Sequence, residues 1–275
     1  MTDTKPILIL GGTGKTGRRL AERLTVQGVP VRIGSRSGSP RFDWEVPATW
    51  GPALQGVRAV YISYYPDIAV PGAAETVDAF ARLAVASGIT RLVLLSGRGE
   101  TEAQRAEEMV KASGADWTIL RCAWFSQNFS EGFLIESLLA GEVALPVGTV
   151  GEPFIDADDI ADAAFVALTE PGHVGQLYEL TGPRLLSFAD AVAEIAKAAG
   201  RDIRYVKVSH DEFTTSVAAH DLPPEFAWLL NELFTEVLDG RNETLTDGVQ
   251  RVLGRAPKDF SAYAHETAAT GVWSN

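Results

Sequence analysis

The sequence predicts an α/β fold, with a doubly wound parallel sheet followed by a smaller mixed α/β lobe at the carboxy terminus. Strand-like and helix-like segments alternate through the first half of the 275 residues, as they do in parallel sheets covered by helices on both faces. A glycine-rich turn joins the first strand to the first helix. The second half alternates less regularly, which indicates a separate lobe.

The first strand is predicted over residues 7–10, an apolar run that leads into Gly11-Gly12-Thr13-Gly14-Lys15-Thr16-Gly17. A helix should follow to about Gln27, with Gly28 as its C-cap. This order of elements aims backbone N–H groups and a positive helix end at one point, which suits the pyrophosphate of a dinucleotide. A tight turn that binds nothing is the alternative.

A nucleotide-binding P-loop is excluded by spacing. Gly14-Lys15-Thr16 resembles the end of that motif, which also needs a glycine five positions before Gly14. Position 9 is Ile9, inside the strand. The glycines at positions 11, 14 and 17 instead form the G-x-x-G-x-x-G variant of the dinucleotide-binding turn.

The end of the second strand, predicted over residues 29–33, favours NADP(H) over NAD(H). An NAD enzyme would place an acid about 20 residues beyond the glycines, to bind the ribose 2′-hydroxyl. No acid lies between Glu22 and Asp43. Arg36 can instead bind a 2′-phosphate through its planar guanidinium, assisted by the hydroxyl of Ser35. A solvated arginine in a polar loop is the alternative.

The remaining elements of the first half continue the alternation. Residues 37–50 show a weaker pattern, so irregular chain or a short strand is expected there. Further strands are predicted over residues 59–63, 91–96 and 117–121, and helices over residues 72–87 and 100–113.

The second half is predicted to hold more helix than strand. We place the domain boundary near Trp124, giving a cofactor domain over residues 1–124 and a substrate lobe over residues 125–275, with a strand near 177–180 returning to the sheet. Helices are predicted over residues 133–139, 156–168, 187–199, 211–219 and 224–238, and strands over residues 177–180 and 203–208.

Composition narrows the classes of function. The net charge of −12 argues against a nucleic-acid partner, because nucleic-acid-binding proteins carry a basic patch or stripe. The single cysteine, Cys122, fits a reducing cytosol, so a cytoplasmic protein is expected. No signal peptide and no membrane span is predicted. No metal site is expected either, because Asp156, Asp158 and Asp159 precede an apolar run and suit the start of a helix.

Six motifs together carry a family resemblance. In chain order, the motifs are the glycine turn, Ser96-Gly97-Arg98-Gly99, the segment 113–121, Phe125-Ser126-Gln127-Asn128-Phe129, the segment 156–161 and the segment 178–183. With these motifs, the chain resembles the NmrA-like branch of the atypical short-chain dehydrogenase/reductase superfamily, and within it the bacterial relatives of the ergot alkaloid biosynthesis reductases.

The resemblance implies a Rossmann-type domain that binds NADP(H) and a small lobe that closes over the nicotinamide end. It also implies a role for particular residues. Gly11, Thr13, Gly14, Lys15, Thr16 and Gly17 would meet the pyrophosphate; Ser35 and Arg36 the 2′-phosphate; Ser63 and Tyr64 the adenosine side; and Ser96, Gly97, Trp124 and Phe125 the nicotinamide.

The usual proton-transfer pair of this superfamily, Tyr-x-x-x-Lys, is missing. The helix after Ser96 contains no tyrosine, and its lysine, Lys111, comes late. Hydride transfer then suits an acceptor that needs little protonation. Ser96, Tyr64 and Glu102 are the candidate proton donors, although Ser96 could equally satisfy the loop at a strand end and Tyr64 could pack in the core.

The predicted function is an NADPH-dependent oxidoreductase that transfers hydride to a small planar acceptor: an imine or iminium, a quinone or an enone. The alternative is a non-catalytic NADP(H)-binding redox sensor with a protein partner. An NAD-type epimerase-like enzyme is a weaker third option, which the lack of an acid near Arg36 opposes. A monomer or a homodimer is expected.

Overall fold

A computed structural model describes residues 5–219 and 223–274. The chain forms two compact units, each built from several segments. The first unit comprises Met1–Cys122, Ala157–Leu180 and Gly248–Arg255, and the second comprises Ala123–Asp156, Thr181–Asp247 and Ala256–Asn275. The first change of unit lies after Cys122, and the chain returns to the first unit twice, not only at the strand near 177–180.

Within the described residues, the first unit holds a sheet of six strands in the order β2-β1-β3-β4-β5-β7. All neighbouring pairs are parallel, which confirms the predicted fold class. The strands are β1 (Ile7–Leu10), β2 (Val31–Gly34), β3 (Ala59–Ile62), β4 (Arg91–Gly97), β5 (Asp116–Cys122) and β7 (Gln176–Leu180).

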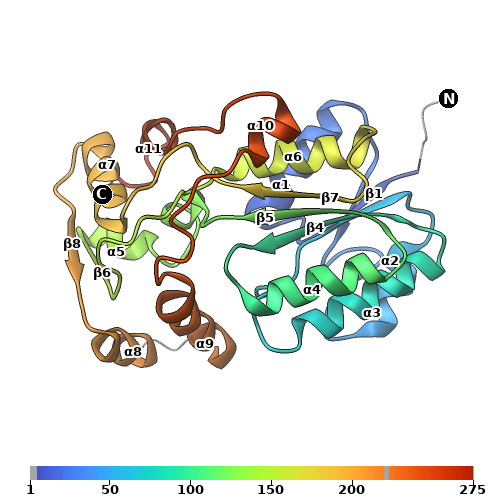
Figure 1. Ribbon diagram of the computed structural model, residues 1–275, viewed down its shortest axis with the longest axis horizontal. Coiled ribbons are helices and arrows are strands. Elements are labelled where there is room, and N and C mark those ends of the chain that lie inside the picture. Colours follow the sequence, from blue (N-terminus) through green and yellow to red (C-terminus); the bar gives the residue numbers. More distant parts are fainter. Residues whose placement is uncertain (1–4, 220–222, 275) are drawn as a thin grey trace. The chain divides into compact units, whose positions relative to one another are not determined.

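Helices cover both faces of this sheet (Figure 1). One face carries α1 (Lys15–Val26), α6 (Ala157–Thr169) and α10 (Gly248–Leu253). The other carries α3 (Ala73–Ala86) and α4 (Thr101–Ala112), which pack against each other. The central strands β1 and β3 are buried along their whole length, as expected for apolar strands between two helical layers.

The order of the strands reverses at β1. Its register pairs Ile7 with Val31 of β2 on one side and with Ala59 of β3 on the other. In sheets of this kind, ligands bind outside the carboxyl ends of the strands at the point of reversal. The turn that follows Leu10 is therefore the place to look for a ligand.

The segment between β2 and β3 is mostly irregular and ends in two short helices, η1 (Pro47–Thr49) and α2 (Trp50–Leu54). The carbonyl oxygen of Ser35 accepts from the N–H groups of Gly38 and Phe42, at 3.1 and 2.9 Å, which closes a loop after β2. An aromatic cluster then anchors the segment. It consists of Phe42, Trp44, Trp50 and Phe80, with ring centroids 5.0 to 6.0 Å apart.

The second unit is mainly helical, and its core is rich in phenylalanine. Among its described residues, two strands pair in parallel, and one of them, β6, was not predicted from the sequence. The elements are η2 (Ser126–Phe129), α5 (Ile135–Ala140), β6 (Glu142–Leu145), α7 (Phe188–Ala199), β8 (Arg204–Lys207), α8 (His210–Ala219), α9 (Pro224–Glu232), η3 (Leu233–Val237) and α11 (Phe260–Ala269).

One predicted helix of the second unit differs from the structure, and another is confirmed. The helix expected over residues 224–238 ends as α9 at Glu232 and continues as the π-helical turn η3. The helix expected over residues 187–199 is α7, which starts with Ser187 and Asp190 capping each other's backbone N–H groups.

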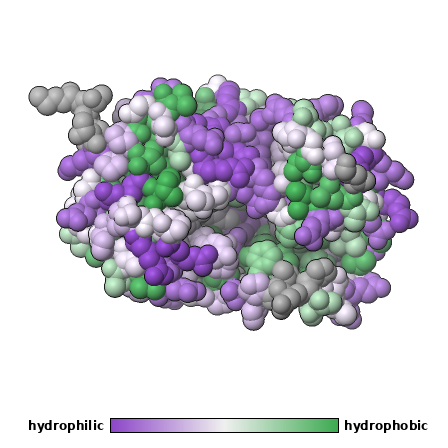
Figure 2. Space-filling model, turned by 180° about the vertical axis from the view of Figure 1, so that it is seen from behind, coloured by the Kyte–Doolittle hydropathy of each residue, from purple (hydrophilic) through white to green (hydrophobic). Residues whose placement is uncertain are grey.

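No helix in the described ranges is both long and apolar enough to cross a membrane. Figure 2 shows hydrophilic side chains over much of one face, with the hydrophobic ones in separate patches.

Candidate cofactor-binding site

The glycine turn connects the end of β1 to the start of α1. Gly11 has a φ of +66°, a conformation that side chains disfavour, and its carbonyl oxygen accepts from the N–H of Gly14 at 2.9 Å. A Cβ on Gly11 would lie 3.1 Å from both Cβ and Oγ of Ser63, just after β3. The predicted residues Gly11, Gly14 and Ser63 therefore lie together at the point where the strand order reverses.

The other two glycines of the turn are required by close packing. A Cβ on Gly17 would overlap the carbonyl oxygen of Gly11 and lie 2.8 Å from Cα of Gly12. A Cβ on Gly12 would lie 2.7 Å from Cδ1 of Ile33 on β2. The first turn of α1 thus packs closely against the end of β1, so the backbone N–H groups of the turn lie within reach of a bound ligand.

The start of α1 suits an anion. Its first turn contains no acidic residue, and the N-cap, Gly14, has no side chain to occupy the N–H groups. These groups have no partner within a helix and carry its positive dipole end. Thr13, Gly14 and Arg18 are exposed, and Lys15 is half-buried. A dinucleotide pyrophosphate fits this arrangement.

Thr16 faces the interior. Its Oγ1 accepts a hydrogen bond from the hydroxyl of Tyr61 at 2.9 Å, and both side chains are buried. Burial raises the pKa of Tyr61 well above its usual range, so the tyrosine stays a proton donor. The Thr16 hydroxyl is thereby held by a bond within the core of the first unit.

Arg36 is exposed just beyond β2, and its Cζ lies 5.4 Å from the centroid of the Tyr65 ring. The nearest following acid, Asp43, is held within its own loop. Its carboxylate accepts from Arg41 at 2.5 Å and from the N–H of Glu45 at 3.2 Å. The bond from Arg41 lowers the pKa of Asp43. Asp43 is thus an ionised group that is already bonded, while Arg36 stays exposed at the end of β2.

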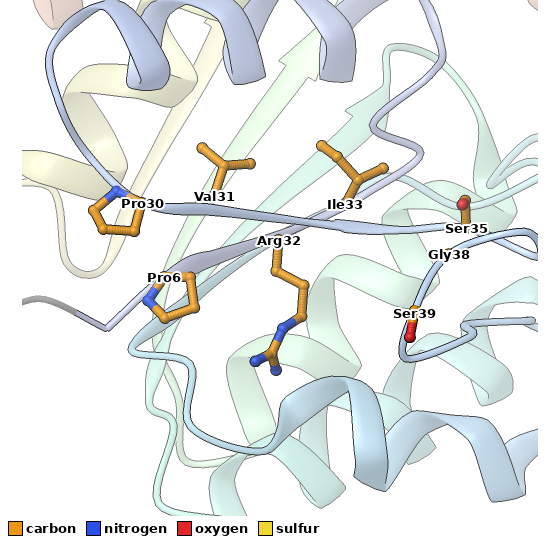
Figure 3. A pocket seen from close by; sticks show the side chains of 8 residues that line it. All are labelled: Pro6, Pro30, Val31, Arg32, Ile33, Ser35, Gly38 and Ser39. Carbon is orange, nitrogen blue, oxygen red and sulfur yellow. The ribbon is translucent and has the colours of Figure 1, made fainter.

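A hollow of about 530 Å³ runs along the outer edge of β2. Figure 3 shows that Arg32 points to one side of the strand and that Val31 and Ile33 point to the other. The guanidinium of Arg32 donates to the carbonyl oxygens of Ala53 and Gln55, at 2.8 and 2.6 Å. Among the predicted cofactor residues, only Ser35 lines this hollow, so it is separate from the glycine turn.

Ser96 is bonded to a buried acid on α4. Its Oγ donates to Oε1 of Glu107 at 2.6 Å, and the two side chains are 3% and 0% exposed. Arg121 donates to both oxygens of the same carboxylate, at 2.9 and 2.5 Å. Arg98 donates to Glu179 at 2.5 Å, and Arg121 lies 3.9 Å from Glu179. The five side chains link the ends of β4, β5 and β7.

Glu102 serves as a cap for α3. Its Oε1 accepts from the N–H groups of Gly72 and Ala74, at 3.2 and 3.4 Å, and Arg105 binds its other oxygen at 2.8 Å. Tyr64 is half-buried, and its ring centroid lies 4.9 Å from that of Trp44, at the edge of the aromatic cluster. The roles of Ser96, Glu102 and Tyr64 as proton donors stay predictions.

Sequence reasoning overlooked Glu100. Its carboxylate lies directly over Gly97, so close that a Cβ on Gly97 would overlap it. It also lies near Cys122, whose pKa is raised mainly by burial and further by Glu100. The sequence feature that could have identified Glu100 is its position immediately after Ser96-Gly97-Arg98-Gly99, at the end of a predicted strand.

The aspartates around the start of α6 take part in hydrogen bonds and ion pairs. Asp158 pairs with Arg23 at 2.8 Å, and Asp159 pairs with Arg255 at 2.6 Å, all within the first unit. Asp156 belongs to the second unit, where it accepts from Gln127 at 3.1 Å. Phe125 also belongs to the second unit and bridges to Ile155, so its predicted place at the nicotinamide stays a prediction. Across the described part of the chain, no group of three or more candidate ligands could hold a metal ion.

The parallel sheet and the turn define a dinucleotide-binding protein of the Rossmann type. Residues 11–171 match the model of the NAD(P)H-binding family, and the chain belongs to that family. Relatives named as an oxidoreductase and as a festuclavine synthase match it at 33% and 32% identity, so the chain belongs to a family of NAD(P)H-binding oxidoreductases. The crystal structure of NmrA, a negative transcriptional regulator, matches with a TM-score of 0.72 and 17% identity, covering 99% of this chain and 100% of that one.

Two curated relatives and a solved structure are similar to this chain over nearly their whole length. The uncharacterized oxidoreductase YesF of Bacillus subtilis is 33% identical, covering 100% of both chains. Festuclavine synthase I of Penicillium roqueforti is 32% identical, covering 94% of this chain and 98% of the relative. The structure of the NADPH-dependent quinone oxidoreductase QOR2 of Escherichia coli, solved with NADPH, has a TM-score of 0.79 and 23% identity, covering 94% of this chain and 99% of that one.

Proposed function

We propose that the protein is an NADPH-dependent reductase that transfers hydride to a small planar acceptor: an imine or iminium, a quinone or an enone. The observation that carries the cofactor preference is the exposed Arg36 beyond β2, in a segment where the nearest acid, Asp43, is already bonded by Arg41. A guanidinium binds a phosphate by two parallel hydrogen bonds, and NADPH differs from NADH by that phosphate. The names of festuclavine synthase I and of the quinone oxidoreductase support the class of acceptor.

The residues of the first unit would bind and orient the cofactor, which supplies the hydride. The N–H groups at the start of α1 hold the pyrophosphate. Arg36 holds the 2′-phosphate, and Tyr65 lies beside its guanidinium. The bonds among Ser96, Glu107 and Arg121 keep the ends of β4 and β5 in a fixed arrangement.

Three residues were candidates to donate the proton that completes the reduction: Ser96, Tyr64 and Glu102. Ser96 and Glu102 are both engaged in bonds that stabilise the fold. Within the described structure the hydroxyl of Tyr64 has no such partner, so we propose Tyr64 as the remaining candidate of the three. An acceptor that forms a weakly basic product needs little help from it.

Oxidation of NADPH, followed by its absorbance, tests the proposal with two acceptors: menadione as a quinone and a cyclic imine. We expect turnover with at least one of them, and a higher kcat/KM with NADPH than with NADH. Tight binding of NADPH without turnover of any acceptor would contradict the proposal.

A redox sensor is the second candidate. It is favoured by the lack of Tyr-x-x-x-Lys together with the structural roles of Ser96 and Glu102. A sensor must distinguish NADP⁺ from NADPH. Titration calorimetry with the two forms therefore tests it, together with a partner that binds in the presence of one form only. Equal affinities with steady turnover would exclude the sensor.

A further inference from the structure

The strand β2 lies at one edge of the sheet of the first unit, so one side of its backbone pairs with β1 and the other pairs with no strand of the described residues. The N–H of Ile7 donates to the carbonyl oxygen of Pro30 at 2.9 Å. With the register of the two strands, this bond shows that Pro30 and Arg32 direct their backbone groups toward β1. Because the backbone direction alternates along a strand, Val31 and Ile33 direct their N–H and carbonyl groups outward.

These outward groups open onto the hollow of about 530 Å³ beside β2 (Figure 3). Among the residues that the structure describes, none bonds to the N–H or the carbonyl oxygen of Val31 or Ile33. The next outward residue, Ser35, is different, because its carbonyl oxygen accepts from the N–H groups of Gly38 and Phe42. The edge is therefore open at Val31 and Ile33, with donors and acceptors at the spacing that a further strand requires, and closed beyond them.

The opposite edge strand, β7, has a helix packed against it. A Cβ on Gly248, the first residue of α10, would overlap the carbonyl oxygen of Glu179 on β7. From the same helix, Arg251 donates to the side chain of Gln176 at 3.3 Å and lies 5.2 Å from the centroid of the Tyr178 ring. Proteins often protect the edges of a sheet by such packing. The edge at β2 instead faces an open hollow.

The charge beside this hollow is positive. The guanidinium of Arg32, a lining residue, donates to the carbonyl oxygens of Ala53 and Gln55, which are neutral. Arg58 adjoins the other end of the lining, where its backbone N–H donates to the carbonyl oxygen of Pro6 at 3.0 Å. Within residues 5–219 and 223–274, no acid forms an ion pair with either arginine. In a chain with a net charge of −12, this edge is a local exception that attracts acidic groups.

We propose that the edge of β2 is a docking site for an extended, acidic segment of a partner protein, which adds a strand to the sheet. The backbone of that segment bonds to the outward groups of Val31 and Ile33. Side chains that lie directly opposite each other in a sheet point to the same face. The segment therefore carries an acidic residue opposite Arg32 and apolar residues opposite Val31 and Ile33. This interaction goes beyond hydride transfer and does not depend on it.

A second copy of this chain fits the same edge less well. Two β2 strands that paired antiparallel about a two-fold axis would bond Val31 of one copy to Ile33 of the other. This register sets the two Arg32 side chains directly opposite each other. Like charges at such positions destabilise a sheet, whereas a carboxylate there is attracted. Charge therefore favours an acidic partner over self-association.

A fluorescein-labelled peptide of six residues in which valine and glutamate alternate is the probe, titrated into the full-length protein by fluorescence anisotropy. We expect saturable binding that weakens as salt is added. Arg32→Gln should remove the preference for this peptide over its counterpart with glutamine in place of glutamate. Arg82→Gln is the matched control, because it removes an exposed arginine of α3 and should keep that preference.

The variant Val31→Pro removes one outward N–H and leaves the bonds to β1, since an edge strand tolerates proline where its N–H faces solvent. The affinity for the glutamate peptide should fall about tenfold, because one hydrogen bond is lost and the proline ring obstructs the ladder. Val31→Ala is the matched control, since it shortens the same side chain and keeps the N–H. Its effect should stay within about threefold.

Two measurements on the wild type cover the case in which Val31→Pro folds poorly. The first uses two N-methylated versions of the peptide, one modified at every valine and one at every glutamate. Only one set of amides faces β2, so one version should lose binding and the other keep it. The second is amide hydrogen exchange, which should slow at Val31 and Ile33 when the unmodified peptide is added.

Three results would overturn the inference: no binding of the glutamate peptide at millimolar concentration, undiminished binding of both N-methylated versions, or unchanged exchange at Val31 and Ile33. Sedimentation of the protein alone tests the rival occupant. A dimer that dissociates in Val31→Pro would show that a second copy covers the edge, and would also overturn the inference.

Discussion

The hydroxyl of Ser96 on β4 donates to the buried carboxylate of Glu107 on α4, with 2.6 Å between Oγ and Oε1. The bond directs the serine proton to a carboxylate that is fully buried. Arg121 binds both oxygens of the same carboxylate, and this bond raises the pKa of the guanidinium. Ser96 is thereby part of a group of side chains that fixes strands to a helix.

We expect Ser96→Ala to reduce stability and to spare turnover. Loss of one hydrogen bond to a carboxylate that Arg121 still binds should cost about 1 kcal/mol. A serine that acted as the general acid would instead change kcat by roughly 10²- to 10⁴-fold. Urea unfolding and steady-state kinetics distinguish the two roles. Glu107→Gln provides the contrast, since it removes the partner charge of Arg121 and should cost about 3 kcal/mol. A collapse of kcat in Ser96→Ala at unchanged stability would restore Ser96 as the proton donor.

Gly17→Ala should destabilise the protein, although alanine favours helices over glycine by about 1 kcal/mol. The added Cβ would overlap the Gly11 carbonyl oxygen, which is backbone and cannot move without displacing the turn. We expect a lower melting temperature and weaker binding of NADPH. The control is Gly51→Ala in α2, where a Cβ meets nothing within 4 Å. Equal effects of the two substitutions would contradict the close approach at Gly17.

Arg36→Gln should weaken binding of NADPH and leave that of NADH unchanged, because only the 2′-phosphate would lose a partner. A charge-assisted hydrogen bond contributes about 1–3 kcal/mol, which corresponds to roughly a 5- to 150-fold change in affinity. Fluorescence titration with both cofactors measures it. Arg82→Gln, which removes an exposed arginine bonded to Asp78 on α3, serves as the control for charge alone. If NADH and NADPH lost affinity equally, Arg36 would not be a phosphate ligand.

The free energy of unfolding of the second unit should decrease at acidic pH, because Asp259 then becomes protonated and loses its bond with Arg184. The hydrogen bond from Arg184, at 2.7 Å, holds the pKa of Asp259 far below its usual value. A carboxylate with a depressed folded pKa stabilises the protein above its unfolded pKa of about 3.9 and loses that contribution as the pH falls toward the folded value.

The variant Asp259→Asn isolates this contribution. It should be less stable than the wild type by about 1 kcal/mol at pH 6, a figure reduced for screening of a carboxylate one-third exposed, and the difference should shrink below about pH 4. Unfolding free energies between pH 3 and pH 7 measure it. Asp239→Asn is the control, because Arg241 lowers the pKa of Asp239 to about 2 at an exposed site, where no measurable change is expected. A difference that grows in acid would have the wrong sign.

The sequence predicted the first unit well because its signals are local. An apolar run before Gly11 and glycines at fixed spacing predict a strand, a turn and a helix without knowledge of distant residues. The second unit gave weaker signals. The strand Glu142–Leu145 has four residues and is defined by pairing with Arg204–Lys207, some 60 positions away. The helix Phe260–Ala269 has only a weak apolar face and was not predicted.

The candidate site likewise has features that the sequence predicts and features that it does not. Backbone features of the turn could be read from glycine spacing, whereas side-chain partners could not. Nothing in the sequence shows that Ser96 faces Glu107 or that Glu102 caps α3, because both contacts join different elements of the fold. Trp124 was expected to lie at the nicotinamide. Its indole N–H has no hydrogen-bond partner in the described structure, unlike those of Trp50 and Trp273, and this difference depends on tertiary contacts that the sequence does not show.

The assembly of the first unit from three segments has a consequence for biosynthesis. The strand β7 and the helices α6 and α10 come from residues beyond 156, so a ribosome must synthesise the chain to about Arg255 before the sheet and its covering layer are complete. Until then, the apolar strand β5 is an open edge that another chain could pair with. A fragment that ends at residue 124 would keep this exposed edge permanently, and we expect it to aggregate when it is expressed alone.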